Sequence, residues 1–299
     1  MKLIMFTDSA GTTRPGVLRG DEAVAIEGYS SIREVFERGE EGMQAARNAN
    51  GATFALSDVR LRTPLIPKKL IHTSGNFREH EEESKNVNWS HEIAPWIVFY
   101  QNVDAIIGPG DAIVYPEHLT RELDHELELA VVIAKSGSNF GEEEAEDYIG
   151  GYLIFNDITA RDIQRNEMRS GVFSFCKSIE TFCPLGPWIV TPDEVGDPHT
   201  LAMRLRVNGE IRQESHSSKM TISIPELLAH HSPCGYSAGD IVTTGTVSGV
   251  AGFKEDAQNW YLKPGDVVEC DIERVGVMSN PVISWQEAHG EPAPPFRDW

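Results

Sequence analysis

The sequence RELDHELELAVVI, residues 121–133, combines a strand signal with a pair of like charges. The unbroken apolar run at residues 130–133 predicts a strand that enters a hydrophobic core. Side chains alternate between the two faces of a strand, so Glu126 and Glu128 point the same way. Leu127 and Leu129 point the other way. The two carboxylates therefore repel each other beside a core, and something must compensate for that repulsion.

Two interpretations of the carboxylate pair remain open at this point. Half-exposed strands with alternating charge are common, so the pair could form a solvated face with Arg or Lys opposite. The apolar run favours a buried strand instead, where unpaired carboxylates are costly. A hard divalent cation would then be the economical partner, because Mg²⁺, Mn²⁺ and Ca²⁺ prefer oxygen ligands. A third candidate ligand is Asp157, which follows an apolar strand in GYLIFNDITARD, residues 151–162.

The overall composition is that of an ordinary globular protein. The chain has 299 residues, of which 40% are hydrophobic and 24% charged, and a formal net charge of −20. Nucleic-acid binding needs clustered Lys and Arg, so we expect no nucleic-acid partner and no membrane partner. No apolar run is long enough for a transmembrane helix. The four cysteines lack metal-binding spacing, which favours reduced thiols and a cytoplasmic protein.

Strand signals dominate the chain, and helical signals are few. A Gly-Asp turn precedes a β-branched run three times, at 108–116, 237–246 and 263–272. Helical spacing is expected at 30–49, with Ser30 or Ser31 as the N-cap, and at about 78–86, 142–149 and 224–231. The prolines around residue 65 predict a small N-terminal α+β subdomain, residues 1–66, and a main catalytic domain, residues 67–299.

A histidine and a glutamate three residues apart form a second candidate site. In GNFREHEEESK, residues 75–85, His80 and Glu83 share one face of the expected helix. Such a pair can take a proton from a water molecule, with one side chain orienting the other. A charged surface helix is the alternative, because carboxylates surround the histidine.

Several motifs resemble, in the right order, the fumarylacetoacetate hydrolase family. The resemblance runs from about residue 70 to residue 282 and rests on LDHELELAVVI, GGYLIFNDITARDIQ, FCKSIETFCPLGPWIVT, RVNGEIRQES and GDIVTTGTVSGV. It points to the bacterial branch that contains acylpyruvases and 2-hydroxyhepta-2,4-diene-1,7-dioate isomerase-like proteins. It implies a mixed, mainly β fold, the fumarylacetoacetate-hydrolase-type β-roll with few short helices, and a homodimer. The strand-rich pattern agrees with that fold independently.

The resemblance also implies roles for individual residues. The metal ligands it implies, for Mg²⁺ or Mn²⁺ with Ca²⁺ as an alternative, are Glu126, Glu128 and Asp157. The catalytic residues it implies, of which the first two lie on a short helix that closes over the substrate, are His80, Glu83 and Lys177. The substrate-binding residues it implies are Arg161, Gln164 and Thr246.

From the residues alone, other roles stay open for two of these side chains. Lys177 could lie at the surface, although Phe173, Phe175 and Phe182 nearby argue against it. Arg161 could pair with Asp162 or with another carboxylate.

One stretch departs from the family pattern. Many relatives carry a lysine shortly after the phenylalanine of a P-x-x-F strand, whereas PWIVFYQNVDAI has Tyr100 and Gln101 there. A cation that could contact the acid groups of a substrate is therefore missing, and the exact substrate is left open.

The expected activity is Mg²⁺- or Mn²⁺-dependent hydrolysis of a C–C bond in a 2,4-dioxo acid, such as an acylpyruvate or fumarylpyruvate. The metal would stabilise the enolate, and the pair His80–Glu83 would activate water. The same enolate serves the alternatives: decarboxylation of oxaloacetate-like acids, keto–enol isomerisation, and isomerisation or hydration of 2-oxo-diene diacids in aromatic catabolism. A non-catalytic metal-binding β-protein is a third class, supported only by the missing cation.

Overall fold

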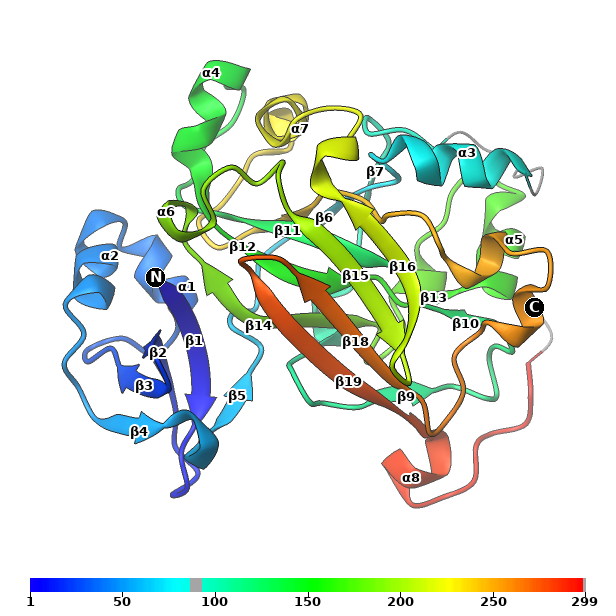
Figure 1. Cartoon of the computed structure of the whole chain (residues 1–299), viewed down its shortest axis with the longest axis horizontal. Coiled ribbons are helices and arrows are strands. Elements are labelled where there is room, and N and C mark those ends of the chain that lie inside the picture. The colour runs from blue at the N-terminus through cyan, green and yellow to red at the C-terminus, as the bar shows by residue number, and fades with distance from the viewer. Residues whose placement is uncertain (87–92, 298–299) are drawn as a thin grey trace.

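The computed structural model describes residues 1–86 and 93–297 (Figure 1). The strands of its long sheet are β1 (Lys2–Thr7), β2 (Thr13–Arg19), β3 (Glu22–Ala25), β4 (Thr53–Ala55), β5 (Arg60–Arg62), β6 (Leu70–Thr73), β7 (Val98–Tyr100), β8 (Ile106–Ile107), β11 (Leu127–Ile133), β12 (Ile149–Asn156), β14 (Cys183–Val190) and β17 (Ile241–Thr243). The strands of the second sheet are β9 (Ile113–Tyr115), β15 (Ala202–Val207), β16 (Glu210–His216), β18 (Val267–Ile272) and β19 (Gly276–Ser284). A short pair is formed by β10 (Leu123–Asp124) and β13 (Thr159–Ala160). The α-helices are α1 (Ile32–Glu37), α2 (Glu40–Arg47), α3 (Arg78–Asn86), α4 (Glu142–Ala145), α5 (Arg161–Met168), α6 (Pro192–Val195), α7 (Ile224–His231) and α8 (Trp285–His289).

The fold is mixed and mainly β, as expected. The long sheet has the order β4-β3-β2-β1-β14-β12-β11-β17-β6-β7, with β5 added on β1 and β8 on β14. The second sheet has the order β16-β15-β18-β19-β9. Most neighbours are antiparallel, but β17 pairs with β6, β14 with β8 and β19 with β9 in parallel. None of the helices in the described part of the chain could span a membrane.

Strand β11 is buried on both of its faces. Leu129 and Val131 join a core cluster that contains Leu205 of β15 and Cys270 of β18, between the two sheets. Ala130 joins a second cluster on the other face of the long sheet. Every residue of β11 is buried, including Glu128. The solvated strand face is therefore excluded as an explanation of the carboxylate pair.

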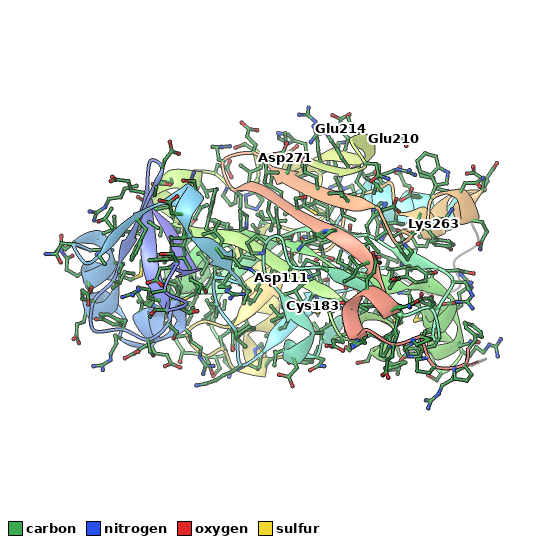
Figure 2. The ribbon with its side chains drawn as sticks, turned by 90° about the horizontal axis from the view of Figure 1, so that it is seen from below. Asp111, Cys183, Glu210, Glu214, Lys263 and Asp271 are labelled. Carbon is green, nitrogen blue, oxygen red and sulfur yellow. The ribbon has the colours of Figure 1, made fainter. Side chains whose placement is uncertain are left out.

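The outer face of the second sheet is polar. Glu210 and Glu214 of β16 and Asp271 of β18 lie on the solvent side of this sheet (Figure 2). Arg204 pairs with Glu214 through Nε and Oε1 at 2.6 Å, and both side chains are largely exposed. The strand carboxylates on this face are at least partly exposed to solvent, whereas Glu128 on β11 is buried.

The N-terminal strands extend the long sheet rather than forming one of their own. Strand β1 pairs with β14 through Lys2↔Val190 and Leu3↔Ile189. In Figure 1 these blue strands form one end of the molecule. The sheet thus runs across residue 66, and a subdomain boundary there remains a proposal.

The helical segment expected at 30–49 is two helices. Ser31 is the N-cap of α1, and its hydroxyl accepts the backbone N–H of Glu34 at 3.1 Å. Gly39 has φ 58°, a conformation that favours glycine, and it separates α1 from α2. The helices expected at 78–86 and 224–231 are confirmed as α3 and α7, and α4 is a short part of 142–149.

Helix α5 was not expected from the sequence. Its eight residues, RDIQRNEM, contain a single large apolar side chain in their first half, so the apolar periodicity that marks a helix is weak. The helix begins directly after β13, and it carries Arg161 and Gln164 to the end of the central strands.

Candidate active site

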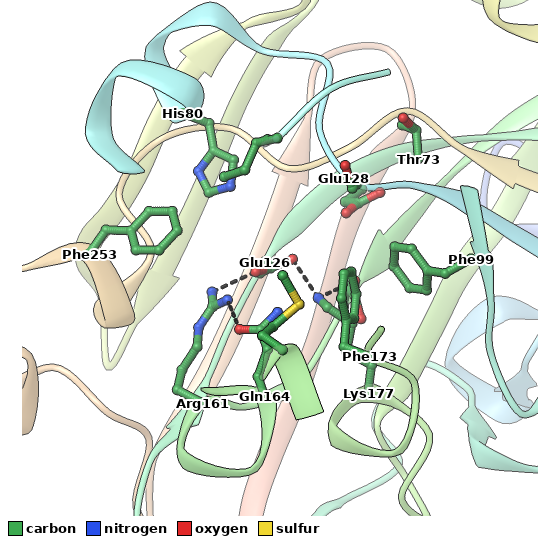
Figure 3. A pocket seen from close by; sticks show the side chains of 14 residues that line it. Thr73, His80, Phe99, Glu126, Glu128, Arg161, Gln164, Phe173, Lys177 and Phe253 are labelled. Carbon is green, nitrogen blue, oxygen red and sulfur yellow. Dashed lines mark hydrogen bonds and ion pairs between the residues drawn. The ribbon is translucent and has the colours of Figure 1, made fainter. Parts of the chain in front are cut away.

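A cavity lies beneath α3, where β6 and β12 end and β11 begins (Figure 3). Its polar lining consists of Thr73, Ser74, His80, Glu126, Glu128, Asp157, Arg161, Gln164 and Lys177. Its apolar lining consists of Ile93, Phe99, Met168, Phe173 and Phe253. The cavity thus combines charged and aromatic side chains. Phe253 lies on the side of His80 and Arg161, whereas Phe99 and Phe173 lie on the side of Lys177.

The three expected metal ligands meet in this cavity. One carboxylate oxygen from each of Glu126, Glu128 and Asp157 lies within 4.8 Å of the other two, and all three residues are buried. The register of β11 on β12 brings them together: Leu127 pairs with Asn156, and the N–H of Asp157 donates to the carbonyl of Glu126 at 2.8 Å. The Asn156 side chain accepts the N–H of Glu126 at 3.0 Å. Asn156 and Asp157 therefore connect the end of β12 to the start of β11 through hydrogen bonds.

Lys177 lies among the carboxylates and not at the surface. Its Nζ donates to Glu126 Oε2 at 2.9 Å, to Asp157 Oδ2 at 2.6 Å and to Thr159 Oγ1 at 2.8 Å. It reaches them from a 3₁₀ turn, Phe175–Lys177. The burial of this ammonium is compensated by its two ion pairs.

Arg161 pairs with two buried carboxylates, neither of which is Asp162. Its Nε donates to Asp124 Oδ2 at 2.7 Å and its Nη2 to Glu126 Oε1 at 2.5 Å. Its Nη1 donates to Gln164 Oε1 at 2.9 Å. Asp124 was missed in the sequence, although it has the same strand parity as Glu126, two positions earlier in the same motif.

The charges at this site suit a divalent cation. Four buried carboxylates, those of the three expected ligands and Asp124, face the two cations of Arg161 and Lys177. Two negative charges thus remain uncompensated among the described residues, and a dication would balance them. The donor set is entirely oxygen, which Mg²⁺, Mn²⁺ and Ca²⁺ prefer. The residues present therefore fit the metal ion that the sequence implies.

The metal-free site holds its carboxylates at very different pKa values. Burial acts to raise the pKa of Glu126, but Lys177 and Arg161 outweigh it and lower that pKa to about 2. Burial, reinforced by neighbouring carboxylates, raises the pKa of Asp157 to about 6 and that of Glu128 well above its usual range. Two of the three ligands are thus easily protonated until a cation compensates for their charge.

These pKa values predict proton release on metal binding. Because the ligand carboxylates must ionise to bind metal, we expect Mn²⁺ affinity to fall about tenfold or more per pH unit below about pH 6. Because its pKa is raised in the folded protein, Asp157 stabilises the fold without metal at low pH, and this contribution is lost as pH rises through about 6. Mn²⁺ should therefore raise the melting temperature more at pH 8 than at pH 5. Calorimetric titration in buffers of different ionisation enthalpy counts the protons, and a pH-independent affinity would contradict the expectation.

His80 lies across the cavity from the carboxylates. Its ring is buried and stacks on Phe253 with centroids 5.1 Å apart and an interplanar angle of 25°. The alternative of a wholly exposed surface helix is thus excluded for this residue. Among the described residues, His80 Nδ1 has no hydrogen-bond partner, and it lies 3.6 Å from Glu83 Oε2. A small shift of either side chain would close that distance to a hydrogen bond.

Helix α3 is tied down on both sides of His80. The Glu83 carboxylate accepts the N–H of Gly249 with both oxygens, at 3.1 and 3.0 Å. Glu79 accepts from Lys219 Nζ at 2.6 Å and also contacts Ser215. Glu83 is not part of the cavity lining.

The three expected substrate-binding residues divide into two groups. Arg161 and Gln164 line the cavity. Thr246 is not among the lining residues: its hydroxyl donates to the carbonyl of Leu127 at 3.1 Å and accepts from Gln213 Nε2 at 3.1 Å. A substrate contact of Thr246 remains a prediction. The three lining phenylalanines, Phe99, Phe173 and Phe253, were missed, and only Phe173 belongs to the phenylalanine cluster that the sequence shows around Lys177.

Gln101, the departure from the family pattern, contacts a ligand carboxylate. Its Nε2 donates to Asp157 Oδ1 at 2.6 Å and to the carbonyl of Lys177 at 2.9 Å. It is buried and is not part of the cavity lining. A neutral amide thus occupies a position from which a lysine would add a second positive charge to Asp157.

We expect Gln101→Lys to weaken metal binding. The added ammonium would compete with the metal for Asp157, and Mn²⁺ affinity should fall about tenfold or more. Gln101→Met, which has the same length without charge, is the matched control and should lose less. Isothermal titration calorimetry with Mn²⁺ measures both variants. Equal affinity of Gln101→Lys and the wild type would show that the charge at this position is unimportant.

The chain belongs to the fumarylacetoacetate hydrolase family. Residues 69–283 match the model of the fumarylacetoacetate (FAA) hydrolase C-terminal domain. The chain is 38% identical over 257 residues to the oxaloacetate tautomerase fahd2 of Xenopus laevis, a match that covers 84% of this chain and 78% of that protein. It is 39% identical over 234 residues to the oxaloacetate tautomerase YisK of Bacillus subtilis, covering 77% and 75%.

A solved structure supports the same assignment. The maleylpyruvate hydrolase from Sphingobium sp. SYK-6, in complex with manganese(II) and pyruvate, superimposes with a TM-score of 0.76 at 29% identity. The match covers 95% of this chain and 99% of that one. The expected family and fold are thus confirmed, and the protein is an enzyme of this family.

Proposed function

We propose that the protein is a Mg²⁺- or Mn²⁺-dependent enzyme that catalyses the keto–enol tautomerisation of oxaloacetate or a closely similar 2-oxo acid. The observation that carries this proposal is the placement of one buried histidine, His80, opposite a carboxylate triad. Tautomerisation needs a group that moves a proton to and from C3 and a site that stabilises charge on the neighbouring oxygen. The two oxaloacetate tautomerases similar to this chain support the same reaction.

The residues of this chain divide the work as follows. Glu126, Glu128 and Asp157 would hold the divalent cation, which when bound supplies Lewis-acid stabilisation of negative charge on oxygen. His80 moves the proton between the enol hydroxyl and C3. The apolar lining residues of the cavity, among them Phe99, Phe173 and Phe253, exclude water from that proton transfer.

Two cationic side chains contact the ligand candidate Glu126. Lys177 and Arg161 keep Glu126 ionised and in place, because they donate to both of its oxygens. Gln164 Oε1 accepts a hydrogen bond from Arg161 Nη1, and this bond restrains the orientation of the guanidinium group.

Hydrolysis of a 2,4-dioxo acid is the second candidate function. It is favoured by Glu83, whose carboxylate lies 3.6 Å from His80 Nδ1 and could orient the ring to activate a water molecule. The similar maleylpyruvate hydrolase supports it as well. We place it second because tautomerisation needs His80 alone, whereas hydrolysis also needs the His80–Glu83 hydrogen bond to form.

A substrate panel with Mg²⁺ or Mn²⁺, against an EDTA control, separates these functions. The panel contains oxaloacetate, an acylpyruvate, fumarylpyruvate and a 2-hydroxy-dienoic diacid, each followed by ultraviolet absorbance of the enol. Metal-dependent change of the oxaloacetate enol signal without loss of carbon supports tautomerisation. Pyruvate formed from an acylpyruvate establishes hydrolysis, and carbon dioxide from oxaloacetate establishes decarboxylation. Inactivity on every compound would overturn both candidate functions.

We also propose that the protein is a homodimer, as the family resemblance implies. Light scattering coupled to size-exclusion chromatography tests this: a mass near twice 33.2 kDa is expected, and a monomer would contradict it.

A further inference from the structure

Asp124, a carboxylate outside the metal-ligand triad, connects two segments that line the cavity. It ends β10, is fully buried and is not itself a lining residue. Among the described residues, its carboxylate accepts four hydrogen bonds. Oδ1 accepts the backbone N–H groups of His125 and Ala251, each at 2.8 Å. Oδ2 accepts from Arg161 Nε at 2.7 Å and from the backbone N–H of Gly252 at 2.8 Å.

The contact with Arg161 fixes a cation that lines the cavity. The guanidinium group lies between Asp124 Oδ2 and Glu126 Oε1, which accepts from Nη2 at 2.5 Å. All three side chains are buried. A rotation of the guanidinium group would break at least one buried ion pair, which is costly. Asp124 thus restrains Arg161 from the side that faces away from the triad.

The contacts with Ala251 and Gly252 fix a 3₁₀ turn, Ala251–Phe253. The first N–H groups of a helical turn have no partner within it, and here two of them donate to Asp124. The turn ends at Phe253, whose ring stacks on His80 with centroids 5.1 Å apart. The same ring lies 5.5 Å from Arg161 Cζ (Figure 3). Asp124 therefore sets the place of the ring that supports His80.

Close packing at Gly252 couples the turn to Arg161. A methyl group on Gly252 would lie 2.8 Å from Arg161 Nε and 2.9 Å from its Cδ. The φ angle of Gly252 is outside the left-handed region, so this position needs glycine for space and not for its backbone conformation. Because the turn and the arginine side chain touch so closely, neither can shift without displacing the other.

We propose that Asp124 is a positioning residue that holds Arg161 and the turn Ala251–Phe253 in one arrangement, so that Phe253 keeps the His80 ring facing the carboxylate triad. Asp124 lies outside the cavity lining, and its effect on proton transfer passes through the stack of Phe253 on His80. A misplacement of about 1 Å, caused by a change far from the reacting atoms, can cost about 10²-fold in rate. This inference deepens the proposed function and rests on the role that it gives to His80.

Three substitutions disturb the arrangement at different points. Asp124→Asn keeps the shape of the side chain but replaces one accepting oxygen by an NH₂ group, which cannot accept from Arg161 or from the turn. Gly252→Ala adds the methyl group beside Arg161 and leaves the carboxylate of Asp124 intact. Phe253→Leu removes the ring that stacks on His80.

Asp162→Asn is the matched control. Asp162 is the neighbour of Arg161 on α5, and its carboxylate accepts from the Thr120 hydroxyl at 2.5 Å and from the N–H of Arg121 at 3.0 Å. It does not line the cavity. The control therefore weakens a carboxylate with structural contacts on the same helix, and it should keep wild-type turnover even where it lowers the melting temperature.

Two readouts separate positioning from general destabilisation. The first is kcat for oxaloacetate at saturating Mg²⁺. The second is the nuclear magnetic resonance signal of the His80 ring Cε1–H, recorded in EDTA on protein labelled with ¹³C in its histidine rings. The His80→Asn variant identifies this signal by its absence. Melting curves check that each variant is folded.

We expect Asp124→Asn to lower kcat about 10–100-fold and to move the His80 signal, because the signal depends on the neighbouring aromatic ring. Gly252→Ala should change both readouts in the same direction and by less. Phe253→Leu should also lower kcat and move the signal. The double variant Asp124→Asn/Phe253→Leu should lose less than the product of the two single losses, because both substitutions act through one stack.

Four results would overturn the inference. These are wild-type kcat in folded Asp124→Asn, a loss of kcat in that variant without movement of the His80 signal, fully multiplicative losses in the double variant, and an equal loss in Asp162→Asn. If Asp124→Asn does not fold, Gly252→Ala decides instead, and wild-type values in both of its readouts would overturn the inference.

Failure of the proposed function looks different. The His80 signal is recorded without metal and without substrate, so it reports the arrangement whatever the reaction is. A wild type that is inactive on oxaloacetate would overturn the proposed function, whereas movement of the His80 signal in Asp124→Asn and Gly252→Ala would still establish that Asp124 positions His80.

Discussion

Glu126→Gln should abolish Mn²⁺ binding and lower turnover about a thousandfold or more, which corresponds to about 4 kcal/mol of lost transition-state stabilisation. The substitution removes a charged ligand from a triad whose oxygens lie within 4.8 Å of one another. It also removes the partner of both Arg161 and Lys177, so the variant should melt at a lower temperature than the wild type. Calorimetry with Mn²⁺ and the oxaloacetate assay measure the two losses.

A second ligand variant and a surface variant make this result interpretable. Glu128→Gln changes a ligand candidate that makes no ion pair with the described lysines and arginines, so it should lose metal while keeping more of the stability. Glu214→Gln changes an exposed strand carboxylate that does not line the cavity, and it should behave like the wild type. Wild-type Mn²⁺ affinity in a folded Glu126→Gln protein would remove Glu126 from the ligand set and undermine the assignment of the site.

His80→Asn should lower kcat about 10²–10⁴-fold while Mn²⁺ affinity changes by no more than about threefold. The imidazole lines the cavity but is not a member of the carboxylate triad, so its loss should affect proton transfer and spare metal binding. Steady-state kinetics, together with the same Mn²⁺ titration, separate the two effects.

Two further variants show which reaction His80 serves. Glu83→Gln should reduce a tautomerase about tenfold at most, because Glu83 lies outside the cavity lining, and it should reduce a hydrolase as severely as His80→Asn does. His230→Asn, on α7 and away from the cavity, is the matched histidine control. Full turnover in a folded His80→Asn/Glu83→Gln double variant would exclude the dyad from catalysis altogether.

The metal triad could be predicted because its geometry is largely local. The two-residue period of a strand placed Glu126 and Glu128 on one side, and the apolar residues around them indicated burial. Asp157 follows the neighbouring strand, whose register joins Asn156 to Leu127. The fold class followed in the same way from short apolar runs separated by turns.

The partners of the triad could not be predicted from local pattern. Lys177 and Gln101 reach Asp157 from 20 and 56 positions away in the chain. From the sequence, Gln101 was notable only because many relatives carry a lysine in this stretch. Nothing near it indicated a contact with a ligand carboxylate. Helix α5 was missed for a related reason: two of its four buried side chains, Arg161 and Gln164, are polar, and their polar contacts replace part of the apolar stripe that marks a helix.

The sequence by itself determined the family, the mainly β architecture, the three metal-ligand candidates and the histidine opposite them. The strand architecture and the shared faces of the two carboxylates and of the His80–Glu83 pair depend on residue types at short spacings, which strand and helix periodicity convert into geometry. The family and the roles of these residues follow instead from the resemblance of several motifs. Only the tertiary structure decided which charges neutralise one another, and that Thr246 faces Gln213 and not the cavity. Those contacts depend on the order and register of strands distant in the chain, and no local pattern encodes them.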